Sequence, residues 1–368
     1  MAEEEGALSK LKNSVMGVLI GLVMIPASFV VVYLASQREQ ASEELVGAYT
    51  VEQAAKAQQE DKAVYITGKI KAPLLGEPGV IKPGPYLSLS KSRQMYGYHD
   101  VEKTRGSGEN KETYYECEVD WLSEGDVSKT GKKCAKEGKT NPAFAIPEYS
   151  GSVKASIESG GTTYNYDTGS KTEASIIDIE KQKTFHGMPS ANITEAEMLG
   201  AYPMKDGKFY ENDGCASSPA IGCERFSYSG TAYDPAGDYT IIGTVEGNTV
   251  KAFRGMFLKI GPGSYDDVMA LLESADTTGT WIYFGLAVIF LGGGLSLLVG
   301  PLLTLIEFIP LIGDFGAGLI RFIFFVFAFF TMGITFLLIE YWYLVLIFFV
   351  LVAVAILFIA KSRKSKSA

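Results

Sequence analysis

The stretch LLTLIEFIPLIGDF, Leu302–Phe315, lies inside a C-terminal block that is apolar almost without interruption from about Trp281 to Ala360. A helix needs about 20 apolar residues to cross the hydrocarbon core of a bilayer, which is roughly 30 Å thick. The block is long enough for three such helices, and a soluble core does not hold so long an apolar stretch. The sequence therefore predicts transmembrane helices over residues 279–304, 318–338 and 341–360.

Two acids and a proline mark the junction between the first two of these helices. Pro310 has no backbone N–H and disfavours a continuous helix through Ile309. Glu307 and Asp314 would each be costly at bilayer depth unless paired. Residues 305–317 are therefore predicted to form a short interfacial hairpin on the cytoplasmic side, with both acids facing water. Two alternatives use the same acids together with Arg321: an ion path through the membrane, or a structural ion pair.

A further apolar run of spanning length, residues 14–35, lies near the N-terminus. The apolar region of a signal peptide is normally about 7–15 residues long, so we interpret this longer run as an uncleaved transmembrane helix. With four spans, the lysines before this helix, Arg321 and the basic tail at 361–368 fall on one side. The positive-inside rule makes that side cytoplasmic. Residues 1–13 are then cytoplasmic as well, and residues 36–278 form an extracytoplasmic or luminal domain.

Small residues recur every fourth position in the predicted helix at 279–304. Gly292, Ser296 and Gly300 share one helix face, and such faces let helix backbones approach closely in lipid. The face can pack against another span of the same chain. It can also pack against a second copy, which would make the protein a homo-oligomer. The sequence leaves both readings open.

Outside the membrane, the pattern changes to short alternating stretches that are typical of β-strands. Thr113–Trp121 alternates apolar or cysteine side chains with acids. Glu246-Gly-Asn248 joins Tyr239–Val245 to Thr249–Phe253, which indicates a hairpin. A helix is predicted over Tyr265–Ser274. The chain is therefore predicted to be a multi-pass α-helical membrane protein with a large α+β external domain in which β-structure dominates.

The cysteines all fall in this external domain, and their number is even. Outside the cytosol an even count indicates disulfides. Four cysteines allow three connectivities, and we favour pairing of nearest neighbours. The predicted bonds are Cys117–Cys134 and Cys215–Cys223. A zinc site is disfavoured because CxxC spacing is missing.

Charge and motifs argue against several functions. The net charge of −9, without a strongly basic surface, argues against nucleic acid as a partner. The sequence contains no GxSxG, HExxH, Walker loop or Rossmann fingerprint. We interpret His99 and His186 as surface or structural residues. We therefore predict no enzymatic activity, no cofactor and no metal. Asn192-Ile-Thr194 is a glycosylation sequon on the external side.

Several motifs are similar to those of one membrane protein family. They are Met95-Tyr96 with Glu102, KETYYECEVDW at Lys111–Trp121, Asn141-Pro142, FSYSG at Phe226–Gly230, and above all Leu302–Phe315 followed by GLIRFIFF. On these motifs the chain resembles the LUMA family, also called the transmembrane protein 43 family, over nearly its full length. The resemblance implies one N-terminal span, a large external domain, three C-terminal spans and no catalytic residues. The four cysteines are not part of the family pattern.

The resemblance also implies a function and a location. Animal members of the family look like scaffolds that organise membrane protein complexes in the endoplasmic reticulum and inner nuclear membrane, and prokaryotic relatives would lie in the cell membrane. Our first hypothesis is therefore a non-enzymatic scaffold whose partners are the lipid bilayer and other membrane proteins. The second is a channel or transporter subunit that uses Glu307, Asp314 and Arg321. The third is a membrane-anchored enzyme or sensor, which requires an external cleft with convergent polar groups.

Overall fold

The computed structural model describes residues 2–105, 112–167, 183–301 and 313–341. The chain divides into two compact units. One is a helical unit built from Met1–Gln40 and Ser274–Ala368. The other is a β-rich unit, Ala41–Glu273.

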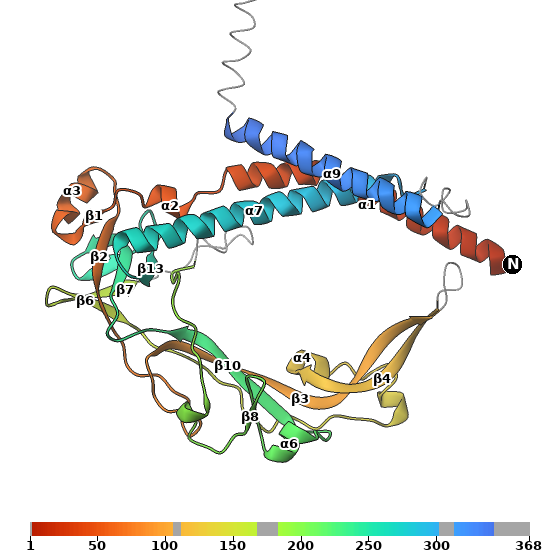
Figure 1. The fold of residues 1–368 in the computed structure, drawn as a ribbon, viewed down its shortest axis with the longest axis horizontal. Helices are drawn as coiled ribbons and strands as arrows, with labels where there is room; N and C mark the ends of the chain where they lie inside the picture. Colours follow the sequence, from red (N-terminus) through yellow and green to blue (C-terminus); the bar gives the residue numbers. More distant parts are fainter. Residues whose placement is uncertain (1, 106–111, 168–182, 302–312, 342–368) are drawn as a thin grey trace, which may run out of the picture. The chain divides into compact units, whose positions relative to one another are not determined.

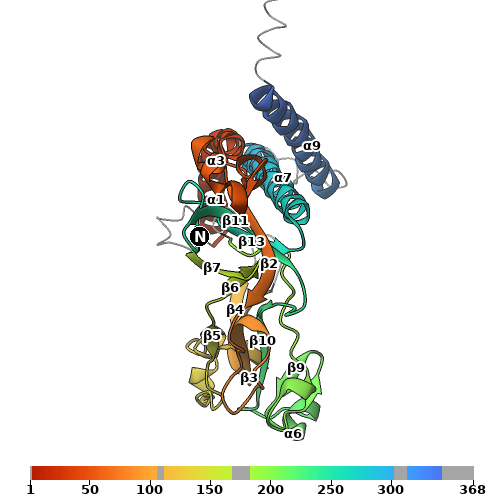
Figure 2. The ribbon, with the colours of Figure 1, turned by 90° about the vertical axis from the view of Figure 1, so that its left-hand side faces the viewer.

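Three long helices form the described part of the helical unit: α1 (Ala2–Ser36), α7 (Tyr265–Leu298) and α9 (Gly313–Glu340). In both views these helices lie side by side (Figure 1, Figure 2). They contain three stretches that are long and apolar enough to cross a membrane: Met16–Glu44, Tyr265–Leu298 and Gly318–Ile339. The spans predicted at 14–35, 279–304 and 318–338 overlap these helices, and residues 302–304 lie outside the described residues. The span predicted at 341–360 and the tail lie outside the described residues.

Helix α7 differs from the sequence-based expectation at its start. We expected a short helix over Tyr265–Ser274 and a separate span beginning near Trp281. The structure makes both one helix of 34 residues. Asp276, Thr278 and the glycine at 279 are weak helix formers, yet the backbone continues through them because tertiary packing overrides propensity.

The three helices pack through small and medium apolar side chains. Their shared core consists of Val32 on α1, Ala287 and Leu291 on α7, and Ala328 and Met332 on α9. Large apolar side chains cover much of the remaining described surface. Those exposed by 60% or more are Leu22, Val23, Trp281, Phe322 and Phe330. So wide an apolar surface fits lipid and does not fit water.

Polar side chains within these helices bond to their own backbones. Ser28 Oγ donates to Ile25 O (2.6 Å) and Ser296 Oγ donates to Gly292 O (2.7 Å). Thr335 Oγ1 likewise donates to Thr331 O at 2.8 Å. In hydrocarbon a hydroxyl must find such a partner within the protein. The hydroxyls are therefore compatible with spans that lie within a bilayer.

One buried ion pair joins Arg38, two positions after the end of α1, to Asp276 of α7. Arg38 Nη2 donates to Asp276 Oδ1 (3.1 Å) and to its carbonyl oxygen (2.9 Å), and the two side chains are 7% and 9% exposed. A Cβ on Gly279 would lie 2.0 Å from Arg38 Nη1, so a larger residue there would displace the guanidinium. This contact fixes the axial position of α1 relative to α7.

The first sheet of the β-rich unit closes on itself. Its strand order is β1-β2-β6-β7-β12-β11-β13, and β2 also pairs with β11, so five of its strands form a ring. The pairs β1–β2 and β7–β12 are parallel and the others are antiparallel. The strands are β1 (Tyr49–Thr50), β2 (Val64–Lys71), β6 (Ser156–Ser159), β7 (Thr162–Asp167), β11 (Tyr239–Glu246), β12 (Thr249–Lys251) and β13 (Lys259–Pro262). Its core includes Ile66, Ile157, Tyr239, Ile241 and Ile260.

The second sheet is open, with the order β4-β3-β10-β9-β8, and β5 pairs with β3. It is drawn in the lower part of Figure 1. Its strands are β3 (Tyr86–Arg105), β4 (Glu112–Ser123), β5 (Ser150–Ser152), β8 (Met204–Lys205), β9 (Lys208–Tyr210) and β10 (Glu224–Ala232). Leu89, Phe209 and Phe226 pack beneath it with Ile81 and Met198.

Short helices connect the strands. They are α2 (Ala41–Glu44), α3 (Ala54–Gln59), α4 (Glu124–Val127) and α6 (Asp213–Ser217), with 3-10 turns at Val51–Gln53, Ala135–Glu137 and Glu195–Glu197. The predicted strand at Thr113–Trp121 is confirmed within β4, and the predicted hairpin is confirmed by β11 and β12. Gly247 supplies the positive φ (59°) that the hairpin turn needs. The predicted α+β domain in which β-structure dominates is therefore confirmed.

Candidate functional site

A hollow of about 430 Å³ opens at the edge of β3 in the second sheet. On this edge β5 pairs with β3 as far as Ser90, and β4 begins to pair at Gln94. Lys91–Arg93 thus belong to no strand ladder on this edge, where the Lys91 N–H donates to Tyr149 O (2.8 Å), although β10 pairs with them on the other edge. The lining is almost wholly polar: Ser90, Lys91, Ser92, Arg93, Ser123, Glu124, Gly125, Glu148, Tyr149 and Ser150.

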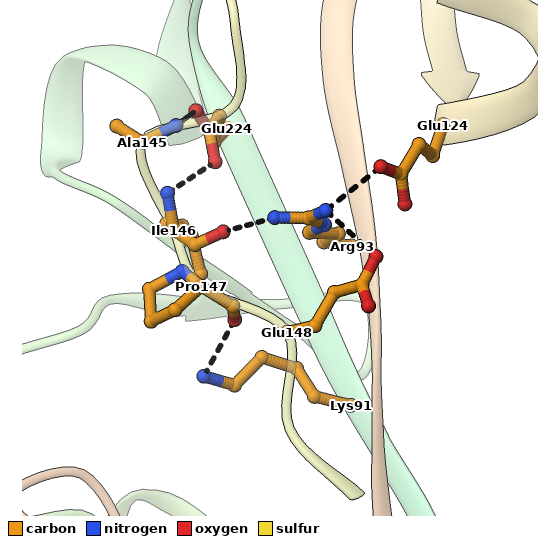
Figure 3. A network of polar contacts seen from close by, with 8 residues as sticks. All are labelled: Lys91, Arg93, Glu124, Ala145, Ile146, Pro147, Glu148 and Glu224. Carbon is orange, nitrogen blue, oxygen red and sulfur yellow. Dashed lines mark hydrogen bonds and ion pairs between the residues drawn. The ribbon is translucent and has the colours of Figure 1, made fainter.

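Arg93 joins the two sides of this hollow (Figure 3). Its Nη2 donates to Glu124 Oε1 (3.0 Å) and to Glu148 Oε1 (2.8 Å), and Nη1 donates to Ile146 O (2.6 Å). The guanidinium also lies 4.6 Å from the centre of the Phe144 ring. Its Nε is buried without a hydrogen-bond partner among the described residues. The Glu148 carboxyl and the Arg93 guanidinium lower the pKa of Glu124. Both carboxylates reach the solvent, so the mouth of the hollow is acidic.

A buried carboxylate holds the loop that carries Ile146 and Glu148. Glu224 on β10 is 1% exposed, and its carboxylate accepts the backbone N–H groups of Ala145 and Ile146, the second at 2.9 Å (Figure 3). Because these bonds are charge-assisted, they hold the loop firmly. The hollow is therefore preorganised by residues that do not themselves line it.

A second buried group lies under the hollow. Lys91 Nζ is 2.5 Å from Glu77 Oε1, and the two side chains are 1% and 7% exposed. The Tyr228 hydroxyl donates to Glu77 as well, and burial followed by this contact raises the pKa of Tyr228. Lys91 Nζ also lies over the rings of Phe226 and Tyr228. Such a group stabilises one arrangement of the sheet only while all its members are present.

The arrangement is suited to recognition. No serine in the lining has a histidine partner, and the described residues contain no group of three histidine, cysteine, aspartate or glutamate side chains arranged to hold a metal. His186 is buried, with Nε2 3.0 Å from Lys183 O, and His99 lies in β3. An open strand edge with hydroxyls and two exposed acids can bind a polar or basic segment of another molecule.

The cysteines pair as predicted from nearest-neighbour order. Cys117 and Cys134 are bonded, with Cα atoms 4.9 Å apart, and Cys215 is bonded to Cys223. The first bond ties the segment after α4 to β4. Asp100 Oδ1 supports the same segment by accepting the N–H groups of Lys133 (2.9 Å) and Cys134 (2.7 Å).

The three residues of the predicted small-residue face do not share one packing partner. A Cβ on Gly292 would lie 2.7 Å from the Phe325 ring of α9. Ser296 bonds to its own helix, and Gly300 has no atom within 4 Å of the same position among the described residues. The closest approach instead uses Gly21 of α1, whose added Cβ would lie 2.6 Å from Gly294 O. This pair was not predicted from the sequence, although glycine at position 21 inside an apolar run was a visible signal.

Most of the predicted interfacial hairpin falls outside the described residues. Glu307 and Pro310 lie there, and so does the side chain of Asp314, whose backbone belongs to the first turn of α9. Arg321 is exposed on α9 and has no ion pair with any residue whose side chain the structure describes. Of these three charged side chains the structure describes only that of Arg321, so the predicted ion path and ion pair lie outside the described residues.

The residues that line the hollow were likewise not predicted as site residues from the sequence. The buried alternate positions of β3 include Leu89, Lys91 and Met95. Arg93 shares this face of the strand and is half-buried. Two cations at core-facing positions of a strand are unusual, because a buried charge requires a partner. Two cations at positions where the strand alternation calls for apolar side chains were the signal visible in the sequence.

Three apolar helices of spanning length together with a disulfide-bonded β-rich unit define an integral membrane protein with a folded domain. The family model described as transmembrane protein 43 matches residues 95–345. This match covers more than half of the chain, so the chain belongs to the transmembrane protein 43 family. No curated protein and no solved structure matches the chain.

Proposed function

We propose that this protein is a non-enzymatic membrane scaffold whose external domain binds segments of other membrane proteins. The polar hollow at the open edge of β3 is the observation that carries the proposal. Recognition by addition to a strand edge uses main-chain hydrogen bonds for affinity and nearby side chains for specificity. The gap between the β5 and β4 ladders places the Arg93 backbone at the open edge, and Glu124 and Glu148 are acceptors for a basic side chain. Family membership supports the membrane setting.

The proposal includes four spans and cytoplasmic termini. The domain at 36–278 then lies outside the cell or in a lumen. Two disulfides support this orientation, since such bonds persist in oxidising compartments. The membrane would be the endoplasmic reticulum or inner nuclear membrane in a eukaryote and the cell membrane in a prokaryote.

Filling the hollow should remove the partner without unfolding the domain. Ser92 is exposed in the gap, so Ser92→Trp places a large ring across the open strand edge. We expect proteins that co-purify with the full chain from native membranes to be lost from this variant. Thr113→Trp is the matched control, because Thr113 is also exposed on the same sheet, on β4. Identical co-purification by both variants and the parent chain would contradict the proposed role of the hollow.

The orientation can be tested through the sequon at Asn192. Asn192 is exposed, and Thr194 forms a capping box with Glu197 at the following turn. When the full chain is made with microsomes, we expect one glycan that is removed by endoglycosidase and is absent from Asn192→Gln. A chain that stays unmodified, while a sequon added at the C-terminus receives a glycan, would reverse the orientation.

A further inference from the structure

The face of the second sheet opposite Lys91 carries two cations that share one acceptor. Arg225 on β10 pairs with Gln94 on β3, and Tyr210 on β9 pairs with Arg225. Arg225 Nε donates to Gln94 Oε1 at 2.9 Å, and Lys208 Nζ donates to the same oxygen at 2.5 Å. Alternation along β3 places Gln94 on the opposite face from buried Met95.

Aromatic rings hold Arg225 in place. Its guanidinium carbon lies 4.2 Å from the centre of the Trp121 ring, and Nη1 is 3.4 Å from the Tyr210 hydroxyl. Trp121 in turn packs edge-on against Tyr210, with ring centres 5.6 Å apart. An arginine stacked in this way loses little conformational freedom when it binds a further group.

No carboxylate among the described residues forms an ion pair with Lys208 or Arg225, although other cations of this sheet do have such partners: Lys91, Arg93, Lys103 and Arg105. The neutral Gln94 amide is the acceptor they share. Burial, followed by the nearby Arg225 guanidinium, lowers the pKa of Lys208. Two adjacent positive charges therefore remain uncompensated in a chain whose net charge is −9.

We propose that Lys208 and Arg225 form a binding site for a phosphate or sulfate group, carried either as a free ion or as an ester on a larger ligand. Two positive charges match the charge of such a dianion. The guanidinium offers a planar donor fork, and the ammonium adds a point charge, which are the two groups that proteins use for phosphate. Trp121 forms the apolar side of the site. None of the residues of this site lines the hollow, and the site does not depend on the scaffold proposal.

The reactivity of the Lys208 amine gives a direct test. The full chain in detergent is treated with an amine-acylating reagent, and each lysine is quantified by mass spectrometry. Inorganic phosphate, sulfate, phenyl phosphate or acetate is added at constant ionic strength. We expect phosphate and sulfate to slow acylation of Lys208 and to leave Lys205 on β8 unchanged. Stronger protection by phenyl phosphate would identify an ester as the better ligand.

Gln94→Glu is the decisive variant. It keeps the shape of the shared acceptor and adds the missing negative charge beside both cations. We expect the affinity for phosphate to fall by about tenfold or more, since one charge-assisted contact of 1.4 kcal/mol or more is lost to an internal competitor. Near-ultraviolet circular dichroism should match that of the parent chain. Equal protection of Lys208 by phosphate in both proteins, or protection by none of the anions, would overturn the proposal.

Discussion

Replacing Lys91 by methionine should lower the free energy of unfolding of the β-rich unit by about 3–5 kcal/mol, because it leaves a buried carboxylate without its cation. The Glu77 side chain is 7% exposed, so water cannot replace the ammonium 2.5 Å away. The Tyr228 hydroxyl still donates to Glu77, but a neutral phenol does not compensate the charge. Denaturant unfolding of the full chain in detergent, followed by near-ultraviolet circular dichroism, measures the loss.

Two controls separate burial from the loss of any lysine. Lys91→Met combined with Glu77→Gln removes both charges and keeps an acceptor for Tyr228, so much of the lost stability should return. Lys103→Met breaks a pair with Glu116 whose side chains are 37% and 45% exposed, and it should cost less than about 1 kcal/mol. Equal effects of Lys91→Met and Lys103→Met would show that the buried pair does not form.

Replacing Gly21 by leucine should separate α1 from α7. The first side-chain carbon would lie 2.6 Å from Gly294 O and 3.1 Å from Leu298 N, and backbone atoms cannot rotate away as side chains do. We expect a cost of at least 1–3 kcal/mol, roughly the cost of overpacking a filled core. The readout is a short thiol-specific cross-link between Met24→Cys and Gly293→Cys, since the Met24 Cε atom lies 3.3 Å from a Cβ built at Gly293. Its yield should fall sharply.

Gly285→Leu is the matched control for this variant. Gly285 lies on α7, the other helix of this pair. Among the described residues, no atom lies within 4 Å of a Cβ built there. Leucine also stabilises a helix more than glycine does, by somewhat under 1 kcal/mol. The cross-link should therefore form in Gly285→Leu as in the parent. An unchanged yield in Gly21→Leu would contradict close contact between α1 and α7.

The family motifs that were visible in the sequence have structural explanations. Asn141 Oδ1 accepts the N–H of Tyr98 (2.7 Å), and its Nδ2 donates to Tyr98 O (2.8 Å), so this side chain takes the place of a neighbouring strand. A Cβ on Gly230 would lie 2.0 Å from Ser88 O, so β10 can approach β3 only with glycine there. These residues build the second sheet, and the hollow depends on them indirectly.

The elements whose signals are local could be predicted from the sequence. Apolar length identified α1, α7 and α9, since a bilayer requires a minimum number of apolar residues. Alternation identified β4, and a short polar turn identified the hairpin of β11 and β12. Nearest-neighbour order was enough for the disulfides because both close short loops, with sequence separations of 17 and 8.

The contacts between residues far apart in the sequence depend on tertiary packing and could not be predicted. Arg225 bonds to Gln94 across 131 residues, and Lys91 reaches Glu77 only because β3 turns that position inward. Helix packing likewise brings Gly21 close to Gly294. The periodic spacing had instead indicated close packing at Gly292, Ser296 and Gly300. Periodicity reports the face on which a residue lies. Its partner depends on strand register and on helix rotation and translation, which are set by the packing of the whole unit.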